Sequence, residues 1–233
     1  MAYRLTRIGT IVGSLVSGDA FAHEVNFEER VRAYLLNNPQ VILDALEVLS
    51  SQQAQSEIAQ KINAYPDVFH ISALGLGSPD ATTKVVEFFD YRCAPCKAVH
   101  PALVSLTEEN PDLRIEMRHL PILSPGSERA ARFALAIELV EGAETYRAVH
   151  NALWTLRGPF NEVSFRGIAN DLGFDFEAVY LAMQSPTIDA EINRNRDIAI
   201  DLEIFGTPAF ISPNSVGFGS TDVNALAELW LNQ

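Results

Sequence analysis

The sequence predicts an α/β fold in which a small sheet is interrupted by a long helical insertion. Short β-branched and aromatic runs, bounded by turn residues, predict strands at residues 83–89, 113–119, 207–211 and 216–218. A helical pattern over about 93–110 joins the first two strands, so they form a βαβ unit. From 128 to about 202 the pattern is almost entirely helical. Two β-rich ends therefore enclose a helical insertion of about 127–202.

Residues 1–22 have the pattern of a secretory signal peptide. Arg4 and Arg7 give a positive start, a short apolar run follows, and the run ends in a small-x-small pattern at Ala22. The alternative is a membrane anchor, but the apolar run has only about half of the roughly 20 residues that span a bilayer. We expect cleavage after Ala22 and export of the remainder.

The expected mature chain is acidic. The whole sequence has 17 basic and 30 acidic residues. Without the predicted signal these numbers become 15 and 29, which gives a net charge of −14. Nucleic acids and anionic membranes bind basic surfaces, so this charge argues against both as partners.

Residues 23–64 predict an N-terminal helical arm. Asn26 is a candidate N-cap, and Pro39 restarts the helix. Apolar residues recur at helical spacing, at Phe27, Val31, Tyr34, Leu35, Ile42, Leu46 and Leu49. This stripe either packs on its own domain or pairs with copies of itself as a homo-oligomer through residues 26–62, and the pattern leaves both open.

The remaining residues, 65–233, predict one domain that holds the sheet and the insertion. Glycine and proline divide the insertion into four helices and the start of a long one, at Gly142, Gly158, Pro159, Gly173 and Pro186. Ser127 and Asn161 are candidate N-caps. Pro101 is expected to interrupt the helix after the first strand.

The chain has only two cysteines, Cys93 and Cys96, at the predicted start of a helix. Unpaired backbone N–H groups and the positive end of the helix dipole favour a thiolate there. The pKa of Cys93, at the mouth of the helix, should therefore fall below the free value of about 8.5. Cys93 is then the nucleophile, and Cys96, one turn further in, resolves the mixed disulfide.

A structural zinc site is the main alternative for this pair. Zinc needs two further ligands, and the five histidines show no suitable pairing. His100 follows Cys96 by four residues and could face the same side, so a weak soft-metal site is conceivable. We predict neither a bound metal nor a cofactor.

Several stretches resemble one family. Residues 85–97 resemble the active-site segment of thioredoxin-fold oxidoreductases, and residues 206–208 resemble their cis-proline loop. The long helical insertion between them resembles the DsbA family of bacterial periplasmic proteins. Residues 121–127 and 31–39 resemble Com1-like and ScsC-like members of that family. The resemblance implies a thioredoxin fold with a DsbA-like insertion and a periplasmic location.

The resemblance also implies roles for individual residues. Cys93 and Cys96 match the attacking and resolving thiols, and Pro208 matches the cis-proline. A cis bond there would leave the Thr207 backbone free to pair with an extended substrate strand. Thr207 and Pro208, with Ala94 and Pro95 between the cysteines in the sequence, are the expected substrate-binding residues.

Glu87 lies six residues before Cys93, where members of the family hold a buried acid. Its neighbours Val86 and Phe88 are apolar, so its pKa should be raised. It could then relay a proton to or from Cys96. The alternative is a solvated strand face, which the apolar neighbours disfavour.

The dipeptide Ala94-Pro95 departs from DsbA, which has Pro-His between its cysteines. No polar side chain is available here to stabilise the thiolate, so a less oxidising pair is expected. We predict an isomerase or reductase acting on periplasmic proteins with thiols or disulfides. One alternative is an oxidase recycled by a membrane redox partner. The other is a metal-tolerance module that binds Cu(I) through the two thiols.

Overall fold

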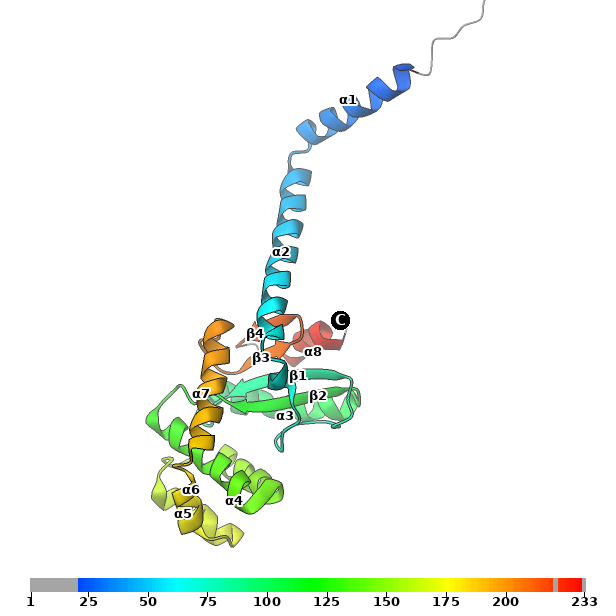
Figure 1. Cartoon of the computed structure of the whole chain (residues 1–233). Helices are drawn as coiled ribbons and strands as arrows, with labels where there is room; N and C mark the ends of the chain where they lie inside the picture. The colour runs from blue at the N-terminus through cyan, green and yellow to red at the C-terminus, as the bar shows by residue number, and fades with distance from the viewer. Residues whose placement is uncertain (1–20, 220–221, 232–233) are drawn as a thin grey trace, which may run out of the picture. The chain divides into compact units, whose positions relative to one another are not determined.

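The computed structural model describes residues 21–219 and 222–231, with side chains from residue 27 onward (Figure 1). Apart from its last two residues, the predicted signal peptide lies outside this part of the chain. The chain divides into two compact units, residues up to 52 and residues from 53 onward. Among the described residues, none of the helices has the length and apolar character needed to cross a membrane.

The first unit contains α1 (Phe21–Asn37) and the first half of α2 (Gln40–Asn63). The helices are separated at Asn38-Pro39, as the sequence predicts, and the Asn38 backbone and side chain both donate to the carbonyl oxygen of Tyr34. Asn26 lies inside α1 and does not cap it, because no glycine or proline stops the helix over residues 21–25. The predicted break is confirmed, and the predicted N-cap is wrong.

The second unit contains a four-stranded sheet in the order β2-β1-β3-β4. The strands are β1 (Thr83–Phe89), β2 (Leu113–His119), β3 (Ala209–Ser212) and β4 (Ser215–Phe218). β1 is parallel to β2 and antiparallel to β3, and Glu87 on β1 lies opposite Met117 and Phe210. The predicted α/β fold is confirmed, and both central strands are buried.

Helices cover both faces of this sheet (Figure 1). α3 (Ala94–Glu109) and α8 (Val223–Leu231) pack on one face, around Val85, Ile115 and Phe210. The 3₁₀ helix η1 (Pro66–Phe69), the end of α2 and α7 (Pro186–Asp201) pack on the other. Ile62 of α2 is fully buried there, so the end of this helix belongs to the second unit.

The helical insertion contains α4 (Pro125–Thr155), α5 (Glu162–Leu172), α6 (Phe176–Ala182) and α7. α4 changes course at Gly142, whose φ of 82° favours glycine. Asn161 caps α5, with its side chain accepting from the Ser164 amide at 3.1 Å. The predicted cap at Ser127 is wrong, because Ser124 caps α4 and Ser127 supplies the amide that donates to it.

The predicted interruption at Pro101 is also wrong. α3 continues through this residue. Proline removes its own N–H and crowds the preceding turn, but the rest of the helix is held by packing of Val99 and Leu103 on the sheet. Tertiary packing therefore overrides the local signal.

Candidate active site

The turn between β1 and α3 positions the two cysteines. The Cys93 amide donates to the carbonyl oxygen of Asp90 at 2.9 Å, which closes the turn. Cys93 is the N-cap of α3, and its sulfur accepts from the Cys96 amide at 3.2 Å. Pro95 lies in the first turn of the helix, where its missing N–H costs nothing. The sulfur of Cys93 thus takes the place of a capping oxygen.

The two thiols have opposite ionisation behaviour. Both are free and buried. The pKa of Cys93 is lowered from 9.0 to about 6, chiefly by a hydrogen bond from the Cys96 thiol, although burial opposes the shift. The pKa of Cys96 is raised far above its ordinary value, because it gives that hydrogen bond and because it is buried. The predicted lowering of the Cys93 pKa is confirmed, and Cys93 can ionise while Cys96 keeps its proton.

The cis-proline loop faces Cys93. The Thr207–Pro208 peptide bond is cis. The Cys93 thiol donates a hydrogen bond to the Thr207 carbonyl oxygen, and the two atoms are 3.1 Å apart. Next to this contact is a groove of about 340 Å³, lined in part by Phe205, Thr207 and Phe218. Phe205 is 81% exposed. The cis bond implied by the resemblance is confirmed, and an extended peptide could reach Cys93 along this loop.

Glu87 is a buried, unpartnered acid on β1. Its side chain is fully buried, and neither carboxyl oxygen has a hydrogen-bond partner. Burial, and secondarily the charge of Cys93, raises its pKa from 4.5 to about 8. The charge of Glu87 in turn contributes to the raised pKa of Cys96. The expectation of a buried acid with a raised pKa is confirmed, and the solvated strand face is excluded.

Ala94 and Pro95, which the sequence predicts to bind substrate, are exposed at the start of α3. His100, one turn after Cys96, lines a separate cavity of about 120 Å³ with Met117 and His150, and its Nδ1 atom has no partner. Within the described ranges, no group of three or more His, Cys, Asp or Glu side chains could hold a metal ion.

Sequence reasoning missed Asp90. Its side chain is 2% exposed. One carboxyl oxygen accepts from the Arg92 amide at 2.8 Å, and the other accepts from the amides of Ile122 and Leu123, both at 3.1 Å. An aspartate two residues before a turn amide is a recognisable turn signal. Its second contact, across about thirty residues, leaves no mark in the local sequence.

A thiol with a lowered pKa, a neighbouring thiol with a raised pKa and a cis-proline loop in this arrangement support thiol-disulfide exchange. Because the two thiols and the cis-proline loop lie at this sheet, the protein is in the class of thioredoxin-fold oxidoreductases. Residues 84–230, more than half of the chain, match the family described as DSBA-like thioredoxin domain. The chain therefore belongs to the DsbA family of thiol-disulfide oxidoreductases. Residues 24–56 match a second family, the copper resistance protein ScsC N-terminal domain.

Solved structures agree with this assignment. The thiol-disulfide exchange protein alpha-DsbA2 from Wolbachia pipientis is 27% identical with a TM-score of 0.67, over 77% of this chain and 97% of that one. A thioredoxin-like oxidoreductase from Silicibacter pomeroyi DSS-3 is 32% identical with a TM-score of 0.61, over 71% and 95%. A linker-deletion mutant of Proteus mirabilis ScsC shares the fold at 21% identity and a TM-score of 0.63, over 94% and 98%.

One curated relative is much longer. The Na(+)/H(+) antiporter NhaA 1 of Salinispora arenicola is 26% identical over 164 residues. This match covers 70% of the chain but spans only 24% of the relative.

Proposed function

We propose that this protein is an exported thiol-disulfide oxidoreductase that acts on protein substrates as an isomerase or reductase. The observation that carries the proposal is the source of thiolate stabilisation. Cys93 is supported by Cys96 and by a backbone amide. Ala94 and Pro95 have no side-chain donor to offer. Weaker thiolate stabilisation gives a less oxidising disulfide, which suits reduction and rearrangement of substrates.

The first step is attack by the Cys93 thiolate on one sulfur of a substrate disulfide. A bond forms between Cys93 and that sulfur, and the other substrate sulfur leaves as a thiolate that takes a proton from water. The Thr207 backbone holds the substrate strand during this step. The exposed positions of Ala94 and Pro95, and the groove beside Phe205, support contacts on both sides of the reacting sulfur.

The second step decides between reduction and isomerisation. In reduction, Cys96 loses its proton and attacks the Cys93 sulfur, which forms the Cys93–Cys96 disulfide and releases the second substrate thiolate. Two electrons then pass from the protein to the substrate. Glu87 accepts the Cys96 proton when it is ionised, because a pKa of about 8 lies close enough to working pH for both of its forms to be present. In isomerisation, another substrate thiolate instead attacks the substrate sulfur of the mixed disulfide. A new substrate disulfide forms, Cys93 leaves as a thiolate, and the protein stays reduced.

The equilibrium of the Cys93–Cys96 pair with glutathione tests the proposal, together with insulin reduction and refolding of a scrambled disulfide protein. We expect reductase or isomerase activity that is lost in Cys93→Ser. Cys96→Ser should trap the mixed disulfide. An equilibrium as oxidising as that of DsbA, with fast oxidation of reduced substrates, would instead support the oxidase.

Binding of Cu(I) is the second candidate, favoured by the match of residues 24–56 to a copper resistance protein's N-terminal domain. Two neighbouring thiols suit this ion. Titration of the reduced protein with Cu(I) distinguishes the two. Tight binding without any thiol exchange supports the metal module, and exchange without tight binding supports the enzyme.

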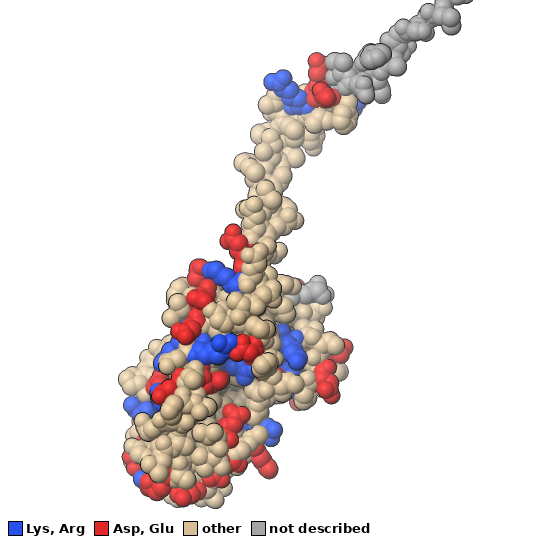
Figure 2. Space-filling view, in the orientation of Figure 1, with Lys and Arg blue, Asp and Glu red and all other residues tan. Residues whose placement is uncertain are grey.

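The arm supports a homo-oligomer. Its apolar stripe is exposed, as are most of the large apolar side chains of α1 and the first half of α2. Phe27, Val31, Leu36 and Ile42 line an apolar groove of about 440 Å³ within this unit. The face of α2 seen in Figure 2 carries few charged side chains. We infer that a second copy of the arm covers this surface, because the arm alone buries almost nothing.

Light scattering of the full mature chain tests this inference. Leu43→Lys and Leu46→Lys should lower the mass to that of a monomer. Gln52→Lys adds the same charge at a polar position of α2 and should leave the mass unchanged. A monomeric mass for the unaltered chain would overturn the inference.

Export to the periplasm and recycling by a membrane redox partner complete the proposed function. The signal-peptide pattern of residues 1–22 supports export. N-terminal sequencing of the protein from a periplasmic fraction should begin at His23. A reductase must be kept reduced in an oxidising compartment, so loss of a membrane electron donor should leave Cys93 and Cys96 oxidised.

A further inference from the structure

We propose that Asp90 is a positioning residue that fixes the cysteine turn against the neighbouring loop of residues 120–124 and limits the oxidising strength of the Cys93–Cys96 pair. The proposal rests on the proposed function. It adds a residue that shifts the equilibrium between the oxidised and reduced forms of the Cys93–Cys96 pair. Three contacts of the Asp90 carboxylate, together with its charge, carry this role.

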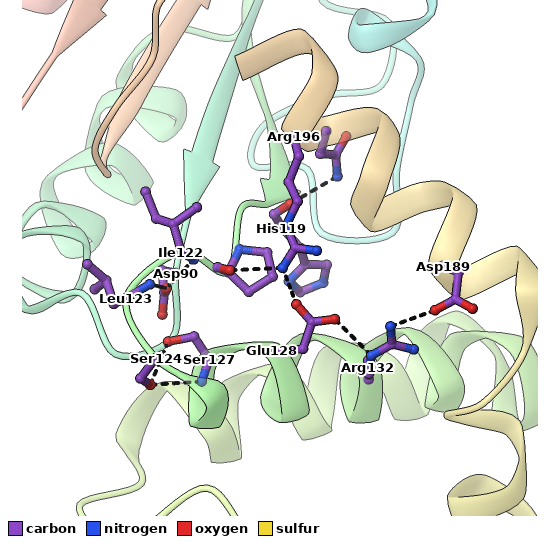
Figure 3. Close-up of polar contacts among 12 residues, drawn as sticks. Asp90, His119, Ile122, Leu123, Ser124, Ser127, Glu128, Arg132, Asp189 and Arg196 are labelled. Carbon is purple, nitrogen blue, oxygen red and sulfur yellow. Dashed lines mark hydrogen bonds and ion pairs between the residues drawn. The ribbon is translucent and has the colours of Figure 1, made fainter. Parts of the chain in front are cut away.

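The Asp90 carboxylate joins two segments that are distant in sequence. One oxygen accepts from the Arg92 amide, inside the cysteine turn. The other accepts from the amides of Ile122 and Leu123, in the loop that follows β2. Figure 3 shows the carboxylate of Asp90 directed at this loop. All three donors are backbone groups, so the contact depends on main-chain geometry and a carboxylate is needed to accept at both oxygens.

The loop is also anchored on its other side. Its first residue, Leu120, donates to the carbonyl oxygen of Phe89 at 2.8 Å. Arg196 of α7 donates to the carbonyl oxygen of Pro121 at 3.3 Å, and Ser124 caps α4. Arg196 is held in turn by an ion pair with Glu128 (Figure 3). With these anchors the loop is a fixed support, and Asp90 is the side chain that ties the cysteine turn to it.

The charge of Asp90 opposes ionisation of Cys93. Asp90 raises the pKa of this thiol, against the larger lowering by the Cys96 hydrogen bond. Two cations are close by: Arg92 lies 5.8 Å and Lys97 5.9 Å from the centroid of the Phe160 ring. Lys97 also interacts with the Asp90 charge, which raises its pKa against the larger lowering by burial. Glu87, beneath the pair, adds a second negative charge only when it ionises. The Asp90 carboxylate, held by three backbone amides, thus places a negative charge near the nucleophile.

The consequence for redox balance follows from the exchange reaction. Two glutathione thiols reduce the Cys93–Cys96 disulfide, which gains two electrons and two protons, and glutathione disulfide forms. A more stable Cys93 thiolate favours the reduced protein and makes its disulfide a stronger oxidant. Because Asp90 destabilises the thiolate, it shifts the pair toward a weaker oxidant, as isomerase or reductase activity requires.

The test uses the full mature chain with Asp90→Asn and Asp90→Glu. In Asp90→Asn the charge is lost and the amide nitrogen cannot accept from a backbone N–H. We expect the Cys93 pKa, followed by thiolate absorbance, to fall. The glutathione equilibrium should move about threefold to tenfold toward the reduced protein, which corresponds to roughly half to one pKa unit. Hydrogen exchange at the Ile122 and Leu123 amides should become faster.

Asp90→Glu keeps the charge and should leave the Cys93 pKa and the equilibrium near their original values. Asp175→Asn is the matched control, because Asp175 caps α6 by accepting from a backbone amide and is exposed. The proposal is overturned if Asp90→Asn leaves both quantities unchanged, or if Asp90→Glu shifts them equally. Failure of the proposed function is a different result, in which the unaltered protein exchanges no disulfides with substrates.

Discussion

The sulfur of Cys93 lies 3.1 Å from the carbonyl oxygen of Thr207, so two segments 114 residues apart meet at one pair of atoms. In the dithiol form Cys93 donates its proton to this oxygen. Once Cys93 is a thiolate it has no proton to donate, and the oxygen becomes free to accept from a substrate backbone amide. Ionisation of Cys93 therefore removes the hydrogen bond to the loop that we propose binds substrate.

The lowered pKa of Cys93 predicts how its reactivity depends on pH. Alkylation of the reduced protein by iodoacetamide should follow a single ionisation near pH 6, the pKa that the Cys96 hydrogen bond produces. Cys96 should react far more slowly, because its pKa is raised and it is buried. Mass spectrometry of modified peptides assigns each site. Equal alkylation rates at the two cysteines would contradict the assignment of roles.

Glu87 should make the protein less stable as pH rises. Its pKa is 4.5 when exposed and about 8 when folded, so the folded state holds the proton more tightly. This stabilisation is present below pH 4.5 and is lost as pH rises toward 8, at up to about 1.4 kcal/mol per pH unit. Urea unfolding of the oxidised protein, whose cysteines neither titrate nor carry charge, measures the part of this loss that burial causes.

Glu87→Gln should remove this slope and also slow resolution of the mixed disulfide. Glu108→Gln, an exposed position on α3, should change neither. If the slope disappears but exchange rates stay the same across pH, Glu87 affects stability alone and has no part in proton transfer.

The strands and the reactive cysteines could be predicted from sequence because their signals are local. The run ending at Phe89 is β-branched and aromatic, and Cys93 and Cys96 follow at once. The cap of α4 has a local signal too, since Ser124 directly precedes Pro125, and this serine-proline order favours Ser124 over Ser127 as the N-cap. The contact of Asp90 with the loop after β2 could not be predicted, because it depends on the register of β1 beside β2.

A buried ion pair anchors the segment before β1 to β2. Arg114 and Glu116 form this pair and are almost completely buried. Glu116 also accepts from the backbone amide and hydroxyl of Ser72, both at 2.7 Å, and Arg114 donates to the carbonyl oxygens of Gly77 and Ser72. These contacts satisfy both charges inside the protein.

Glu116→Ala should lower the free energy of unfolding by about 3–5 kcal/mol, because it leaves the Arg114 charge buried without an opposite charge beside it. The double variant Arg114→Met with Glu116→Leu should be less destabilised than Glu116→Ala alone. A double-mutant cycle from urea unfolding measures the coupling, and additive effects of the two changes would contradict the pairing.

Two buried histidines predict instability in acid. His119 bonds to the Tyr146 hydroxyl at 2.7 Å, and His150 bonds to the Tyr91 hydroxyl at 3.0 Å. Burial lowers the pKa of each histidine from 6.5 to about 3. A lowered folded pKa gives stability that is present above pH 6.5 and is lost as pH falls toward 3. Each histidine contributes a loss of up to about 1.4 kcal/mol per pH unit.

The two effects act in opposite directions, so these groups place the maximum of stability near pH 6.5. Above it only the loss from Glu87 remains, and below it the two histidines together outweigh Glu87. His119→Gln and His150→Asn keep a group that can bond to each tyrosine but cannot titrate, so each should flatten the acid side of the curve. His70→Gln, an exposed position, should leave the curve unchanged. If the free energy of unfolding falls equally steeply in acid in all three variants, then carboxylates, and not these histidines, cause acid unfolding.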